Sequence, residues 1–158
     1  MTIQPNTDRE LMLTLLKQHA FVADLSDAQL ALLADLARSR TVEPKALLAK
    51  EGEPAETFTL IVSGHIAIEI HTPARGTIRL QTIGPGEALG WSWLIVPHRW
   101  QFDARVIETA QVLEFDSAKL RESCERDHEF GYQLLKRLLT MIAARLSATR
   151  VQLLDVYQ

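Results

Sequence analysis

Hydrophobic and polar residues alternate in the middle of the chain. In residues 65–71, HIAIEIH, the isoleucines stand at every second position, and residues 77–81, TIRLQ, alternate in the same way. A period of two gives an extended strand one apolar face and one polar face. Residues 104–115 form a third short segment that contains valine, isoleucine and phenylalanine. We therefore predict antiparallel strands in this part of the chain.

Glycine and proline punctuate the same region. Five of the six prolines and six of the seven glycines lie between residues 44 and 97. They recur roughly every 8–12 residues, the spacing of many short strands in a sandwich or barrel. We expect a β-roll or jelly-roll barrel over residues 43–116.

Helical patterns flank the strands. Residues 8–20 and 27–37 contain no glycine or proline and carry recurring leucines, and Ser26 precedes the second stretch as an N-cap. We predict N-terminal helices within residues 1–42. On the other side, Ser117 is expected to cap a short helix and Asp127 a long one.

The long helix is expected to reach about Val156, and it carries a heptad seam. Its apolar residues recur in alternating steps of three and four, at Leu139, Ile142, Leu146, Thr149, Leu153 and Val156. Such a seam is typical of a helix that pairs with a partner helix, so we expect a homodimer through residues 127–156. The alternative is that this stripe packs on the β-domain of its own chain.

These patterns together predict one α+β domain over residues 1–158. Its parts are N-terminal helices (1–42), an antiparallel β-roll (43–116) and C-terminal helices (117–158) that include a long dimerisation helix. A length of 158 residues suffices for one well-buried core.

Composition narrows the function classes. The chain carries 17 basic and 20 acidic side chains, a formal net charge of −3, which argues against a DNA-binding or membrane-binding surface. A single cysteine, Cys124, leaves no disulfide within the chain. No export signal and no apolar run of ~18 residues is visible, so we expect a cytoplasmic protein with no membrane contact.

Several motifs in order resemble the cyclic nucleotide-binding domain of the Crp–Fnr regulators, of the regulatory subunit of cAMP-dependent kinase and of nucleotide-gated channels. They are LSD at 25–27, LAKEGEPA at 48–55, LIVSG at 60–64 and GPGE at 84–87. The resemblance extends over nearly all of the chain from about residue 20. It implies a regulatory module rather than an enzyme. For a chain that ends at residue 158, it also implies no helix-turn-helix, no direct DNA binding and an output through a partner protein.

The same resemblance places the phosphate-binding cassette at residues 84–105. It implies that Glu87 accepts a ribose hydroxyl and that the backbone amides of four residues line the pocket, namely Gly86, Glu87, Ala88 and Leu89. The implied ligand is a cyclic nucleotide, cAMP or cGMP, and no cofactor is required.

The end of the cassette departs from the family pattern. The family has an arginine, a small residue and an alanine there, whereas Phe102 and Asp103 precede Ala104 in this chain. The family's arginine pairs with the cyclic phosphate, and Asp103 would present a like charge instead. We expect Arg99 or Arg105 to supply the cation, and the sequence does not distinguish them.

The cassette contains all three tryptophans of the chain, Trp91, Trp93 and Trp100, in one stretch of ten residues. They either stack on a base, which is worth ~1–3 kcal/mol per base, or fill the pocket and the barrel core. Trp91 and Trp93 have the same parity and are expected to point to one side, and Trp100 is the favoured ligand contact. On the long helix, the resemblance implies that Thr149 and Arg150 reach the base across the dimer.

Two other classes remain as alternatives. The Phe102–Asp103 departure fits a degenerate domain that binds no ligand and acts as a dimeric interaction scaffold. A metalloenzyme of the cupin type is disfavoured, because His65, Glu69 and His71 share one strand face but lack the cupin ligand spacing.

Overall fold

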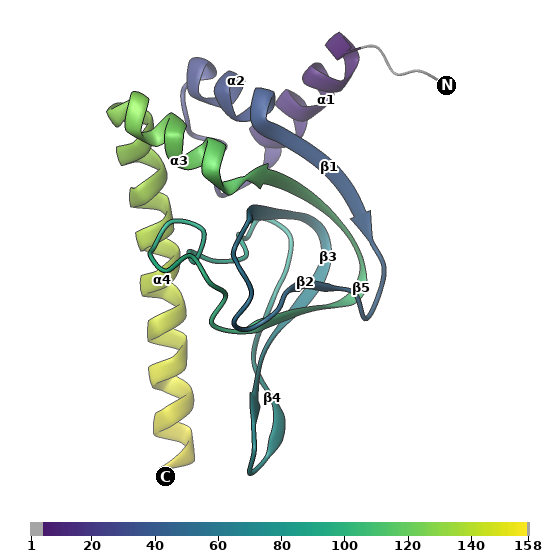
Figure 1. Cartoon of the computed structure of the whole chain (residues 1–158), viewed down its shortest axis with the longest axis vertical. Coiled ribbons are helices and arrows are strands. Elements are labelled where there is room, and N and C mark those ends of the chain that lie inside the picture. The colour runs from purple at the N-terminus through teal and green to yellow at the C-terminus, as the bar shows by residue number, and fades with distance from the viewer. Residues whose placement is uncertain (1–4, 158) are drawn as a thin grey trace.

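The computed structural model describes residues 5–157 and confirms the α+β class. Its elements, in chain order, are α1 (Pro5–Gln18), α2 (Asp27–Leu36), β1 (Ala37–Val42), β2 (Leu47–Ala49), β3 (Thr57–Thr72), β4 (Gly76–Ile83), β5 (Asp103–Asp116), α3 (Ser117–Arg126) and α4 (His128–Val156). The strands form one rolled antiparallel sheet, and α4 runs along its side (Figure 1).

Strand β5 organises the sheet, because its two halves have different partners. Its C-terminal half pairs with β1 and its N-terminal end pairs with the short β2, while β3 pairs along nearly its whole length. The path order is β1-β5-β3-β4. Because different parts of β5 pair with different strands, the sheet rolls around its apolar face.

The predicted short strands are in fact two long ones. β3 spans 16 residues and β5 spans 14, so Gly64 lies inside a strand and does not end one. Gly64 has φ +83°, and a Cβ on it would lie 2.5 Å from the carbonyl oxygen of Thr109. The pairing register shifts on both sides of this position. The glycine therefore permits the bend that the sheet needs.

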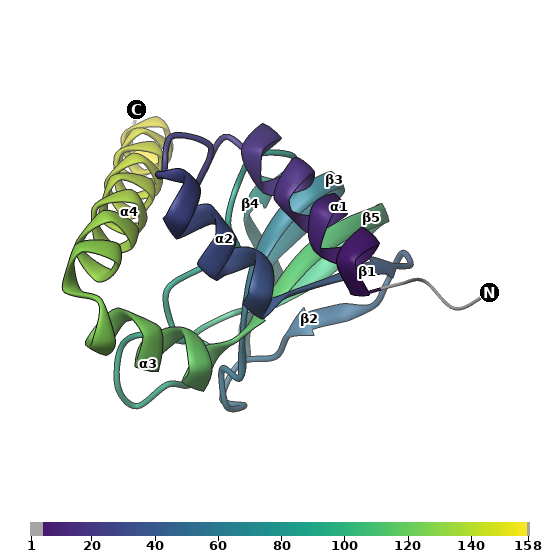
Figure 2. The same cartoon turned by 90° about the horizontal axis from the view of Figure 1, so that it is seen from above.

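The N-terminal helices end earlier than predicted. Helix α2 stops at Leu36, and residues 37–42 form β1, antiparallel to β5, so the strands begin before residue 43. Figure 2 shows α1 and α2 lying over the sheet. They bury Leu16, Leu30 and Leu33 completely.

The observed N-cap residues match the predicted ones at two of three helices. Ser26 caps α2 in a capping box with Gln29, and the Asp127 carboxylate accepts a hydrogen bond from the amide of Phe130 (3.0 Å). The prediction for Ser117 is wrong. Asp116 caps α3, and the buried Ser117 hydroxyl donates instead to the carbonyl of Ala55 (3.0 Å).

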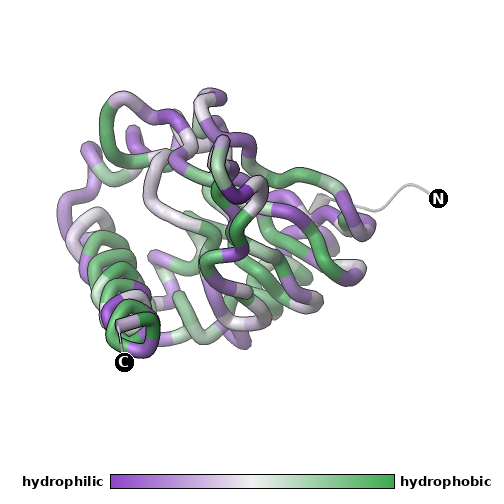
Figure 3. The backbone as a smooth tube through the Cα atoms, turned by 90° about the horizontal axis from the view of Figure 1, so that it is seen from below, coloured by the Kyte–Doolittle hydropathy of each residue, from purple (hydrophilic) through white to green (hydrophobic). Residues whose placement is uncertain are grey.

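Helix α4 presents two different faces. Phe130, Leu134 and Leu138 are buried against the domain. Several residues of the heptad seam are exposed, with Leu139 at 67% and Leu146 at 49%. Figure 3 views α4 nearly end-on and shows hydrophobic positions recurring along it. None of the helices in the described part of the chain is long and apolar enough to cross a membrane.

Gly64→Ala is expected to lower the free energy of unfolding by about 2–5 kcal/mol, because the new Cβ meets the backbone of β5 and the left-handed φ is strained. Gly76→Ala is the matched control, since Gly76 has φ +69° but open space around it, and should cost about 1–2 kcal/mol. Urea unfolding followed by circular dichroism measures both. Equal losses would mean that close packing at Gly64 is unimportant.

Candidate functional site

The cassette leaves β4 through a tight turn. Gly86 has φ +84°, a conformation that glycine adopts without strain. One oxygen of the Glu87 carboxylate accepts a hydrogen bond from the amide of Gly84 (2.6 Å). Beyond this turn, residues 91–97 form consecutive turns rather than the extended segment that the parity of Trp91 and Trp93 assumed.

A hollow of about 430 Å³ lies between this turn and α4. Its size is within the usual range for ligand pockets. Gly86, Glu87 and Ala88 line one side. The other walls come from the segment after α1, from β4 and from α4, through Phe21, Gln81, Arg137, Met141 and Arg145.

Three of the four cassette amides already have partners in the backbone. The amide of Gly86 donates to Ile61 (3.0 Å), that of Glu87 to Gly84 (3.1 Å) and that of Leu89 to Thr59 (2.9 Å). Leu89 is fully buried and does not line the hollow. An anion in the hollow therefore depends on side chains more than on an amide cradle.

The cation in the hollow comes from α4. Arg145 donates a short hydrogen bond to the carbonyl of Ala88, and its Nε is buried without a hydrogen-bond partner. Burial lowers the pKa of Arg145, and the nearby charge of Glu87 opposes that shift. A partly unsatisfied guanidinium in an apolar setting favours an anionic ligand, which restores its missing interactions.

The cations expected from the sequence lie elsewhere. The guanidinium of Arg99 donates to the carbonyl of Gly52 (2.8 Å), and Arg105 pairs with Glu69 (2.9 Å). Asp103 accepts a hydrogen bond from the amide of Glu51 (2.8 Å). None of these three side chains lines the hollow.

The aromatic residues of the cassette mainly pack on one another and on the core. Trp93 is fully buried against Phe58, with ring centroids 4.9 Å apart. Trp100 and Phe102 are also buried and contact each other, and Trp91 packs edge-on against Phe102. No tryptophan borders the hollow at Glu87, so these rings fill the cassette rather than line its pocket.

The remaining predicted residues stay outside the hollow of their own chain. Ala104 is buried in β5. Thr149 is exposed and donates to the carbonyl of Arg145 within α4 (2.9 Å), and Arg150 is exposed. Contact of Thr149 and Arg150 with a ligand in the pocket of a partner subunit stays a prediction.

The sequence contained an unused signal for Arg145. The domain-facing stripe of α4 runs through Leu134, Leu138, Met141 and Arg145 in steps of four, three and four. An arginine on the face that otherwise packs on the core is unusual, which makes it a candidate functional position. Phe21 carried no comparable signal, because its position depends on how the segment after α1 folds back.

The other candidate chemistries find no support. His65 pairs with Glu108 and Glu69 pairs with Arg105. No group of three or more potential metal-binding side chains occurs among residues 5–157. Burial raises the pKa of the Cys124 thiol to about 11, which favours the protonated thiol near neutral pH.

Comparison with known proteins identifies one family. The family model described as the cyclic nucleotide-binding domain matches residues 39–127. No curated protein sequence matches the chain.

Solved structures share the fold. A protein from Geobacter metallireducens GS-15, provisionally assigned as a cyclic nucleotide-binding protein, is 25% identical, with 92% of this chain and 99% of that chain covered and a TM-score of 0.72. A cyclic nucleotide-binding domain from Methylobacillus flagellatus KT is 18% identical, with coverages of 93% and 83% and a TM-score of 0.78.

A third similar structure is a regulatory subunit of a cAMP-independent protein kinase A from Trypanosoma brucei. It is a triple mutant bound to cAMP, and it is 18% identical, with a TM-score of 0.64. The match covers 80% of this chain and 50% of that one.

The placement of the aromatic rings predicts how their removal affects stability. Trp93→Ala should lower the free energy of unfolding by about 3–5 kcal/mol, because it opens a cavity beside Phe58. Trp91→Ala, at a half-buried ring, should cost only about 1–2 kcal/mol. Urea unfolding followed by far-ultraviolet circular dichroism measures both. A small loss for Trp93→Ala would contradict its position in the core.

Proposed function

Because the chain belongs to the cyclic nucleotide-binding domain family, we propose that it is a ligand-sensing regulatory module. It binds a cyclic nucleotide, or a related nucleotide, in a divergent cassette and signals through α4. No catalytic role is assigned to it. The family supports nucleotide sensing in general, and the finer proposal depends on the pocket between Glu87 and Arg145.

Arg145 carries the proposal. Arg145 is half-buried, and burying its Nε without a partner costs folding free energy, so its presence on the domain-facing stripe favours a role in binding. In this scheme the guanidinium of Arg145 pairs with the ligand phosphate, the role that the sequence analysis expected for Arg99 or Arg105. Glu87 has one carboxylate oxygen engaged with Gly84, and the other is available for a sugar hydroxyl.

The position of the cation links the ligand to α4. Arg145 belongs to the helix, whereas Ala88, which it contacts, belongs to the cassette. A ligand phosphate would compete with the Ala88 carbonyl for the same guanidinium. The affinity for the ligand would therefore depend on whether α4 holds Arg145 against Ala88 or away from it. A difference in affinity between two conformations is what allows a ligand to shift the equilibrium between them.

The similar kinase subunit from Trypanosoma brucei is a reason to test nucleotides other than cAMP on this chain. That protein is described as cAMP-independent, and its cAMP-bound form carries an introduced arginine and two introduced alanines. For this chain, a nucleotide other than cAMP belongs in the test panel.

The second candidate function is a ligand-free dimeric scaffold. It is favoured by Trp100 and Phe102, which fill the cassette, and by the exposed seam of α4. A homodimer through residues 127–156 and an output through a partner protein are part of both proposals.

Calorimetric titration with cAMP, cGMP, cyclic dinucleotides and 5′-AMP tests the sensor proposal. We expect saturable binding of at least one nucleotide, weakened at least about tenfold by Arg145→Gln, because a hydrogen bond to a charged group is lost. Glu87→Ala should weaken binding similarly. Arg126→Gln, at an exposed arginine paired with Glu122 on α3, should leave affinity unchanged. No binding across the panel would favour the scaffold.

Sedimentation equilibrium tests the dimer. The wild-type protein is expected to associate, and Leu146→Asp should shift it to monomer, since a charge enters the apolar seam. Val151→Asp is the matched control, because Val151 is 59% exposed but lies outside the heptad seam. Equal effects of the two substitutions would place the interface elsewhere on α4.

A further inference from the structure

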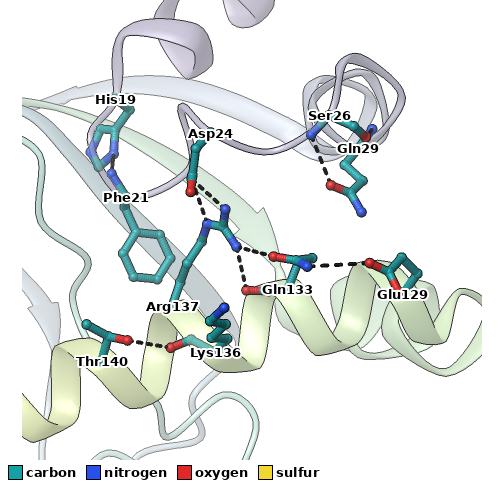
Figure 4. Close-up of polar contacts among 10 residues, drawn as sticks. All are labelled: His19, Phe21, Asp24, Ser26, Gln29, Glu129, Gln133, Lys136, Arg137 and Thr140. Atoms are coloured by element: carbon teal, nitrogen blue, oxygen red, sulfur yellow. Dashed lines mark hydrogen bonds and ion pairs between the residues drawn. The ribbon is translucent and has the colours of Figure 1, made fainter.

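A buried histidine follows α1, next to the residues that line the ligand hollow but not lining it itself. His19 is 5% exposed, and its Nε2 lies 2.7 Å from the carbonyl oxygen of Ile61. Its Nδ1 accepts a hydrogen bond from the amide of Phe21 (3.2 Å), as Figure 4 shows. Because Nδ1 must accept, the proton of the neutral ring is on Nε2, which donates to Ile61.

The carbonyl of Ile61 also holds the cassette. It accepts the amide of Gly86 (3.0 Å), while the amide of Ile61 donates to the carbonyl of Glu87 (2.9 Å). One backbone oxygen of β3 therefore receives both the imidazole and the glycine of the ligand turn. A Cβ on Gly86 would lie 3.3 Å from the Cβ of Ala20, so the two segments are also in close contact.

The segment of residues 19–24, which we term the 19–24 turn, forms one wall of the hollow. Ala20 and Phe21 line it. At the end of the turn, the carboxylate of Asp24 pairs with Arg137 on α4 (2.5 Å), as Figure 4 also shows. The turn therefore contacts β3, the cassette and the signalling helix.

We propose that His19 is a positioning residue for the cassette. As a neutral imidazole it docks the 19–24 turn on the carbonyl that orients Gly86, and protonation of the ring releases the turn from the hollow. When Nδ1 gains a proton it becomes a donor that faces the Phe21 amide, which is also a donor. The Phe21 bond is then lost, and the ring acquires a charge in an apolar site.

The electrostatic surroundings determine the direction of the pH effect. Burial lowers the pKa of His19, and the hydrogen bond to Ile61 opposes this shift only in part. No charged group forms a hydrogen bond to the imidazole within the described residues. The charged groups on or beside the turn are Lys17 at the end of α1, Asp24 in the turn itself, Glu87 in the cassette, and Lys136, Arg137 and Arg145 on α4.

Two of these groups are paired with each other. The hydrogen bond from Arg137 lowers the pKa of Asp24, so this ion pair persists at mildly acidic pH. His19 is then the titrating group of the turn. Its released form has an ordinary pKa near 6.5, and below that value the released form binds more protons than the docked form. Docking is complete above this pH and weakens as the pH falls.

The test uses amide hydrogen exchange in the ligand-free protein, measured by nuclear magnetic resonance and corrected for intrinsic exchange rates, between about pH 8 and pH 5. Protection of the Phe21 and Gly86 amides should fall below the released-state pKa, approaching tenfold per pH unit because one proton is linked to opening. His19→Gln offers a donor and an acceptor but does not titrate, so its protection should not depend on pH. His128→Gln, at an exposed histidine, is the control and should behave as wild type.

The wild-type titration decides the proposal even if His19→Gln fails to fold. Phe21 protection that stays constant in wild type, or that responds equally in His19→Gln, would overturn it. The effect on a ligand rests on the proposed function and is measured with the nucleotide that binds best in calorimetry, whose affinity should fall at low pH in wild type but not in His19→Gln. If no nucleotide binds, the sensor proposal fails while the exchange data still test His19.

Discussion

The pairing of the cassette with β3 is the constraint on which the rest of the site depends. Ile61 exchanges hydrogen bonds with Gly86 and Glu87, and Thr59 accepts the amide of Leu89. These bonds fix the Glu87 carboxylate at the mouth of the hollow and direct the following turns into the core. They also use the amides that would otherwise hold an anion, so the charge of a ligand must be met by a side chain. The arginine of α4 then becomes the central group of the site.

This arrangement explains how the cassette tolerates Phe102 and Asp103. Phe102 packs between Trp91 and Trp100, and the Asp103 carboxylate is satisfied by the amide of Glu51. Phe102 and Asp103, at the positions where the resemblance would place the family's arginine and small residue, therefore stabilise the loop and do not line the hollow at Glu87. The hollow lies between the turn at Gly86 and α4, and Glu87 and Arg145 are both among its lining residues.

Periodic patterns predicted the class of the fold and several of its elements, but neither the strand lengths nor the site. The alternating isoleucines of β3, the cap at Ser26 and the extent of α4 were predictable, because each depends on residues close in sequence. Strand length was not, since Gly64 reads as a turn until its contact with β5 is known. Proximity in sequence to the cassette favoured Arg99 and Arg105 as the cation, whereas Arg145 lies 57 residues along the chain from Ala88, which it contacts. Its one local sign was a charge on a core-facing helical stripe.

Helix α4 therefore takes part in two different kinds of contact. Its domain-facing stripe packs Leu134 and Leu138 and places Arg145 at the cassette, while its seam leaves Leu139 and Leu146 exposed. A helix is stiff, so under the proposed function a ligand that displaced Arg145 would also move the seam, and a partner bound to the seam would in turn affect the position of Arg145. The coupling is reciprocal by linkage, and the 19–24 turn enters it through Asp24 and Arg137. In the proposed scheme, a proton on His19 and an anion bound at Arg145 would therefore act on the same helix from two sides.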